Sequence, residues 1–170
     1  MFKKGDCIVY GSTGICEVLD VTTMDMEGIP NNKLYYILKP YLKKGSEIFT
    51  PVDNKKTVIR DLISVKEAKE LLQCIESLGE FKVTNEKFRE DCYKQCVRGS
   101  DCMEIMKLIK TLHLRKYSRL VQGKNFPSTD ERYLKLAEDN LYAELAFVLN
   151  KDSKQISDYI EQQIHSCIPV

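Results

Sequence analysis

The sequence predicts an α+β, multidomain fold, in which a small SH3- or Tudor-like β-barrel is followed by a compact all-α bundle of about five helices. Apolar residues recur with the strand period of two up to about residue 60, and with the helical period of 3.6 after Asp61. The 43% hydrophobic content supplies a real core and excludes an intrinsically disordered chain. We therefore expect one domain at residues 1–62 and a second at residues 63–170.

Four or five short strands are expected in the first 60 residues. Residues 6–10 are β-branched and aromatic, and the Gly11-Ser12-Thr13-Gly14 segment that follows is a strong turn signal, because glycine adopts positive φ freely. The strongest strand is expected at residues 34–38, and residues 47–51 return as another. Such a small, strongly curved barrel has no room for an interior ligand, so it would bind partners through its surface and edges.

Helix signals begin directly after the expected domain boundary. Ser64 and Glu67 have the spacing of a capping box, so a helix should begin there and end at Gly79. A second helix is expected at residues 85–98, and a third should begin near Asp101.

Two further helices complete the expected bundle. Gly123 should end the third helix. Ser128 and Glu131 again have capping-box spacing and predict the start of a fourth helix. The last helix is expected at residues 153–165.

The composition indicates where the protein is located and whether its cysteines bind a metal ion. No apolar run approaches the ~18 residues of a membrane helix, and no signal-peptide pattern is present, so we expect a cytoplasmic protein. The seven cysteines, an odd number scattered along the chain, fit reduced thiols better than a disulfide framework. Cys92, Cys96 and Cys102 are close enough to suggest zinc, but no second ligand pair accompanies them. Apolar packing of these thiols is favoured, and no metal is expected.

Catalysis requires a constellation of residues that this sequence lacks. His113 and His165 are in helical context, and neither accompanies a Ser or Cys in a nucleophile motif. The turn at residues 11–14 lacks the lysine and the following helix of a phosphate loop. We therefore expect no enzyme and no cofactor.

Charge is unevenly distributed although the net charge is only +1. Residues 105–129 carry six basic side chains and no acidic one, whereas residues 130–170 carry eight acidic and four basic. This pattern fits either a polarised binding surface or ordinary solvated helix faces.

Short motifs occur in a specific order along nearly the whole chain. The N-terminal part contributes Phe2-Lys3-Lys4-Gly5-Asp6-Cys7-Ile8-Val9-Tyr10 with Gly14, and Pro51-Val52-Asp53-Asn54. The helical part contributes Gly99-Ser100-Asp101, Leu112-His113-Leu114-Arg115-Lys116, Asp130-Glu131-Arg132-Tyr133-Leu134-Lys135-Leu136-Ala137 and Glu144-Leu145-Ala146. In this order the segments resemble the CarD/CdnL family of bacterial transcription regulators.

The resemblance implies two partners. In that family a Tudor-like N-terminal domain docks on the β subunit of RNA polymerase, partly through an exposed sheet edge. The helical domain contacts promoter DNA, mostly its backbone and minor groove, at the upstream edge of the melted bubble. The implied function is regulation of transcription initiation through open-complex stability. A monomer without membrane contact is expected.

The resemblance also implies DNA-binding residues. The family commonly wedges a Trp into the minor groove where this chain has Asn85, with Phe88 the nearest aromatic residue. Two interpretations stay open: Phe88 is an exposed wedge, or Phe88 is core and Asn85 is an N-cap. The basic residues implied in phosphate contact are Lys87, Arg89, Lys94, Lys116, Arg119 and Arg132.

On the polymerase side, the family often has Arg where this chain has Met24 and Phe49, so docking should rest more on main-chain pairing and apolar contact. Because Ile48 and Phe49 alternate faces, one is expected in the core and the other at the interface. The expected surface, on strands near residues 21–26 and 47–51, comprises Met24, Met26, Glu47, Ile48, Phe49 and Pro51.

Two other functions stay open. The first is a protein–protein adaptor that uses the barrel on polymerase or another protein without direct DNA contact. The absence of Trp and the balanced charge of residues 63–170, with 17 basic and 17 acidic side chains, favour it. The second is a redox sensor, which predicts an accessible cysteine of low pKa.

Overall fold

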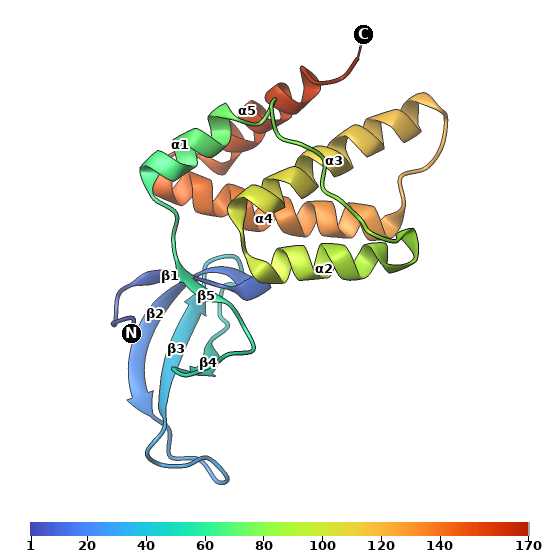
Figure 1. Ribbon diagram of the computed structural model, residues 1–170. Coiled ribbons are helices and arrows are strands. Elements are labelled where there is room, and N and C mark those ends of the chain that lie inside the picture. The colour runs from blue at the N-terminus through green and yellow to red at the C-terminus, as the bar shows by residue number, and fades with distance from the viewer. Residues whose placement is uncertain (170) are drawn as a thin grey trace. The chain divides into compact units, whose positions relative to one another are not determined.

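Two compact units make up the chain, Met1–Leu62 and a second that begins at Ile63. The computed structural model describes residues 1–169. Within that range the first unit is a five-stranded antiparallel sheet and the second contains five α-helices, which confirms the predicted α+β class (Figure 1).

The sheet has the strand order β4-β3-β2-β1-β5, so β4 and β5 are its two edges. Neighbouring strands pair antiparallel throughout, as expected for short strands joined by tight turns. The strands are β1 (Cys7–Tyr10), β2 (Gly14–Thr23), β3 (Leu34–Pro40), β4 (Ile48–Pro51) and β5 (Ile59–Asp61).

One face of the sheet carries the core of the first unit. A bulge between Val18 and Asp20 bends β2, which helps the sheet to curve over this core. Gly11, in the turn before β2, has φ of +44°, and a Cβ atom there would lie 2.7 Å from Thr57 Cγ2, so only glycine fits this turn. The buried residues of the cluster are Ile8, Cys16, Val18, Tyr36 and Leu38.

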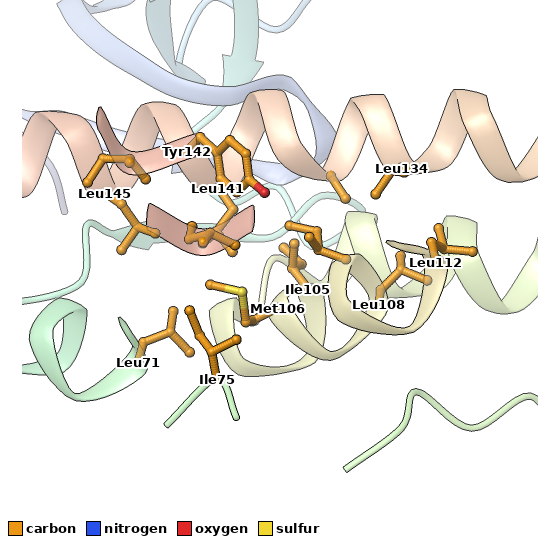
Figure 2. Packing of buried hydrophobic residues seen from close by; sticks show 14 of the residues in the cluster. Leu71, Ile75, Ile105, Met106, Leu108, Leu112, Leu134, Leu141, Tyr142 and Leu145 are labelled. Atoms are coloured by element: carbon orange, nitrogen blue, oxygen red, sulfur yellow. The ribbon is translucent and has the colours of Figure 1, made fainter. Parts of the chain in front are cut away.

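In the helical unit, α4 is central because it packs against each of the other four helices (Figure 1). Figure 2 shows apolar side chains of α3 and α4 interdigitating, with Leu71 and Ile75 beside them. The helices are α1 (Val65–Gln73), α2 (Arg89–Gly99), α3 (Cys102–Val121), α4 (Ser128–Leu149) and α5 (Ser153–His165). Two short 3-10 helices, η1 (Gly11–Thr13) and η2 (Glu86–Phe88), complete the elements. No helix within residues 1–169 is long and apolar enough to cross a membrane.

Two of the predicted helix starts form as expected. Ser64 and Glu67 make the reciprocal bonds of a capping box, and Asp101 caps α3 by accepting from the Glu104 N–H at 3.1 Å. The capping box predicted at Ser128 is wrong. Pro127 is the N-cap of α4, so Ser128 is already helical, and the Glu131 carboxylate contacts Lys116 instead.

The first helix ends earlier than predicted, at Gln73 rather than Gly79, and a buried lysine binds the turn that follows it. Lys110 of α3 is 7% exposed, and its ammonium group donates to the carbonyl oxygens of Ile75, Glu76 and Leu78 at 2.8–2.9 Å. Carbonyls that follow the end of a helix lack intrahelical donors, and one side chain binds three of them here. Lys110 therefore belongs to the core and not to a basic surface.

Candidate functional site

Within residues 1–169, the outer edge of β4 has no neighbouring strand. The Val52 N–H donates to Leu34 O at 3.0 Å, so Val52 and, by alternation, Thr50 direct their backbone groups toward β3. Phe49 and Pro51 then direct theirs to the free edge. Proline has no N–H, and the Pro51 carbonyl already accepts from the Asn54 N–H at 3.0 Å. The free edge therefore offers mainly the N–H and the carbonyl of Phe49.

Side chains on β4 alternate as the sequence indicates. Ile48 packs against the sheet core, whereas 49% of Phe49 is exposed. An aromatic side chain thus lies on the edge strand, where a partner strand would pair.

The remaining residues of the expected polymerase surface lie in loops or at strand ends. The prediction of a strand near residues 21–26 is wrong at its end, since β2 stops at Thr23. Met24 is half-buried and Met26 is exposed in the loop that follows, while exposed Glu47 precedes β4 and half-buried Pro51 ends it. β4 therefore carries the part of this surface that lies in regular secondary structure.

The structure resolves the two interpretations of Asn85 and Phe88. Asn85 caps η2, accepting from the Lys87 N–H at 3.0 Å, so its side-chain oxygen already has a partner. Phe88 is 51% exposed and therefore is not a core residue. The Lys87 ammonium lies 5.9 Å from the Phe88 ring centroid, which places a cation beside an exposed aromatic ring.

Arg89, implied in phosphate contact, lies in a buried ion cluster instead of projecting freely. Its Nε is 3.2 Å from Oδ1 of the fully buried Asp130, and Arg115 Nε is 3.2 Å from Oδ2. These are charge contacts without hydrogen-bond geometry. Burial, followed by the charge of Asp130, raises the pKa of Tyr93 to about 12. Asp130 thus joins α2, α3 and α4, and no sequence spacing indicated this cluster.

Two other implied cations are paired with carboxylates of neighbouring segments. Lys116 Nζ lies 3.1 and 3.2 Å from the two oxygens of Glu131. Arg132 pairs with Glu90 and stacks on the Tyr133 ring at 5.1 Å. Sequence reasoning missed both carboxylates, because Glu90 is 42 positions from its partner and Glu131 is 15 from its own.

Lys94 and Arg119 have no carboxylate partner in the described part of the chain. Lys94 is exposed on α2. The Arg119 Nε donates to Asn125 O at 2.6 Å. The basic stretch at residues 105–129 is therefore not one continuous cationic face, because Lys110 is buried and Arg115 and Lys116 are paired.

The cysteines do not form the zinc site that the sequence raised. Among residues 1–169, no group of three or more His, Cys, Asp and Glu side chains could hold a metal ion. All seven cysteines are free. Burial raises the pKa of Cys16 to about 11 and that of Cys96 to about 12, so neither is a reactive thiolate at neutral pH.

Comparison with known proteins bears on the first unit. Residues 2–63 match the family described as the CarD-like/TRCF RID domain. The N-terminal unit is a CarD-like/TRCF RID domain. The match covers this unit alone and supports its likeness to a CarD-like, RNA polymerase-interacting family. The RID domain includes the β4 edge and Phe49, and its family is a protein-interaction family and not a known enzyme family. No curated protein matches the sequence.

Proposed function

We propose that this protein is a cytoplasmic, bacterial regulator of transcription initiation. Its RID domain docks on the RNA polymerase β subunit through β4, and its helical unit contacts promoter DNA at the upstream edge of the melted bubble. The match of residues 2–63 to the RID family carries the proposal, and the open β4 edge supplies a physical means of docking.

Docking combines main-chain pairing with one aromatic anchor. A polymerase strand that lies antiparallel or parallel to β4 would pair with the outward N–H and carbonyl of Phe49. The 49% exposed Phe49 ring would then be buried against it. This mode does not need the arginines that the family often has at positions 24 and 49.

DNA contact is proposed for the start of α2 and its surroundings. The exposed Phe88 ring is positioned to wedge between bases, and Lys87 and Lys94 to contact the adjoining phosphates. Regulation follows if the protein binds open promoter better than closed. A preference of about 1.4 kcal/mol shifts that equilibrium tenfold.

The docking half of the proposal predicts that Phe49→Ala weakens retention of purified bacterial RNA polymerase about tenfold or more, because a central aromatic anchor is lost. The measurement is capture of polymerase by the immobilised full-length chain over a concentration series. Val58→Ala, an exposed residue (41%) just before the opposite edge strand, is the matched control and should bind like wild type. If both variants bind normally, β4 is not the docking edge.

The DNA half predicts salt-sensitive binding to a forked promoter fragment. With Lys87, Lys94 and Arg119 unneutralised, log K should fall against log salt with a slope of roughly −3. Fluorescence anisotropy over a range of KCl concentrations measures it. Phe88→Ala should weaken binding to forked DNA more than to the matched duplex. Salt-independent binding, or none, would remove DNA from the proposed function.

A protein–protein adaptor is the second candidate, and an apolar surface at the end of α3 favours it. Leu120 and Val121 are 61% and 69% exposed there. They adjoin a groove of about 400 Å³ lined by Tyr117 and Ile168 among others. Such a surface fits a protein partner better than it fits nucleic acid. An adaptor would retain polymerase in the capture experiment and show no salt-sensitive DNA binding.

A further inference from the structure

Two surface carboxylates pair with two of the cations that the family resemblance implies in phosphate contact. Glu90 of α2 contacts Arg132 of α4, and Glu131 of α4 contacts Lys116 of α3. Both pairs connect different helices, so they arise from the packing of the bundle and not from the ordinary i,i+3 or i,i+4 spacing along one helix.

Each pair is held by more than its two charges. The Tyr133 hydroxyl lies 3.4 Å from Glu90 Oε1. The guanidinium carbon of Arg132 lies over the Tyr133 ring, 5.1 Å from its centroid. On the other pair, the Lys116 ammonium lies 5.5 Å from the Phe126 ring centroid and contacts both oxygens of Glu131. These contacts restrict both cations to positions facing their carboxylates.

The pairs nevertheless remain open to solvent. The side chains of Arg132 and Glu90 are 62% and 52% exposed, and those of Lys116 and Glu131 are 37% and 54% exposed. A phosphate can therefore reach each cation. A carboxylate and a phosphodiester are both anionic oxygen acceptors, so they compete for the same N–H donors.

We propose that Glu90 and Glu131 set the DNA affinity of this protein by competing with backbone phosphates for Arg132 and Lys116. This inference rests on the proposed DNA contact and deepens it. When DNA binds, each cation exchanges its carboxylate for a phosphate, and the released glutamate regains water and counterions. The protein therefore binds promoter DNA more weakly, and with less salt dependence, than its cations alone would allow.

The size of the effect follows from the exposure of the pairs. Exposed ion pairs contribute little free energy. Removing one of the two glutamates should therefore tighten DNA binding by about two- to fivefold. Removing both should tighten it by roughly five- to twentyfold, since the pairs share no residue. Each freed cation should also steepen the salt slope, by at most about 0.9.

The test measures binding of the full-length protein to a forked promoter fragment by fluorescence anisotropy at several KCl concentrations. Glu90→Gln, Glu131→Gln and the double variant should bind more tightly than wild type. Glu70→Gln is the matched control, because Glu70 is a 62% exposed partner of Lys66 on α1, away from the proposed contacts. It makes the same change in net charge and should leave affinity within about 1.5-fold. A gain in affinity cannot arise from unfolding.

A double-mutant cycle separates competition from simple loss of negative charge. If Glu90 acts by occupying Arg132, then Glu90→Gln has no effect in an Arg132→Gln background. Glu131→Gln should likewise have none in a Lys116→Gln background.

Three results are distinguishable. Gains that vanish in these backgrounds support the proposal. Gains that persist there, or that equal the effect of Glu70→Gln, overturn it while leaving DNA binding intact. If neither wild type nor any glutamate variant binds at about 100 µM protein in low salt, the proposed DNA contact itself fails.

Discussion

Replacing Asp130 with alanine is expected to lower the free energy of unfolding by about 3–5 kcal/mol. Asp130 is fully buried and lies between Arg89 and Arg115, each 3.2 Å away. Without it, two partly buried guanidinium groups lose the anion that lies between them, and within residues 1–169 only Arg89 keeps another carboxylate, that of Glu86. Against a typical stability of about 5–15 kcal/mol, this loss is large. Urea unfolding followed by circular dichroism at 222 nm measures it, because every α-helix described lies in the second unit.

Glu131→Ala is the control for the Asp130 experiment. It removes an acid from the same helical turn, with the same change of charge near the N-terminus of α4. Glu131 is exposed and contacts only the surface residue Lys116, so a loss below about 1 kcal/mol is expected. Equal effects of the two variants would mean that Asp130 acts through the helix dipole and not through the arginines.

Lys110→Met should lower the free energy of unfolding by about 2–3 kcal/mol. Methionine keeps the unbranched chain in the core but removes the donor to the carbonyls of Ile75, Glu76 and Leu78. Relief from burying an ammonium offsets part of the loss, and water can reach the partly exposed carbonyls. Faster amide hydrogen exchange at residues 74–81 would locate the damage.

Lys107→Met is the matched control, one helical turn earlier on α3. Lys107 pairs with Glu104 at 3.0 Å on the surface, so its replacement should cost less than about 0.5 kcal/mol. A Lys110→Met variant as stable as this control would show that the three carbonyls need no donor from α3.

Elements with strong local signals could be predicted from the sequence, and the ends of elements set by distant residues could not. The fifth helix was expected at residues 153–165 and α5 spans Ser153–His165, since its Asp152 cap and apolar period are local. The end of α1 was misplaced, and the turn that replaces its predicted last residues is bound by Lys110, more than thirty residues away. The Ser128 capping box failed because Pro127, one residue earlier, already serves as N-cap.

The candidate site shows the same division. Alternation along β4 correctly separated Ile48 from Phe49, because the strand period is a property of the backbone. For Lys116, Arg115 and Arg132 the sequence indicated a positive charge. It did not indicate whether that charge is free to contact a phosphate. Each is paired with a carboxylate brought to it by helix packing, and pairing across helices leaves no periodic trace in the sequence.

The β4 edge also affects how readily copies of this protein associate through their sheets. An open strand edge can add a strand from any chain, including a second copy of the same edge, and long flat edges are the starting points of aggregation. β4 has only four residues, and Pro51 withholds an N–H on the outward side. Two such edges meeting would gain few hydrogen bonds. A short edge of this kind selects against indiscriminate sheet extension, so a stable complex must draw its affinity from side chains such as Phe49 that fit one partner.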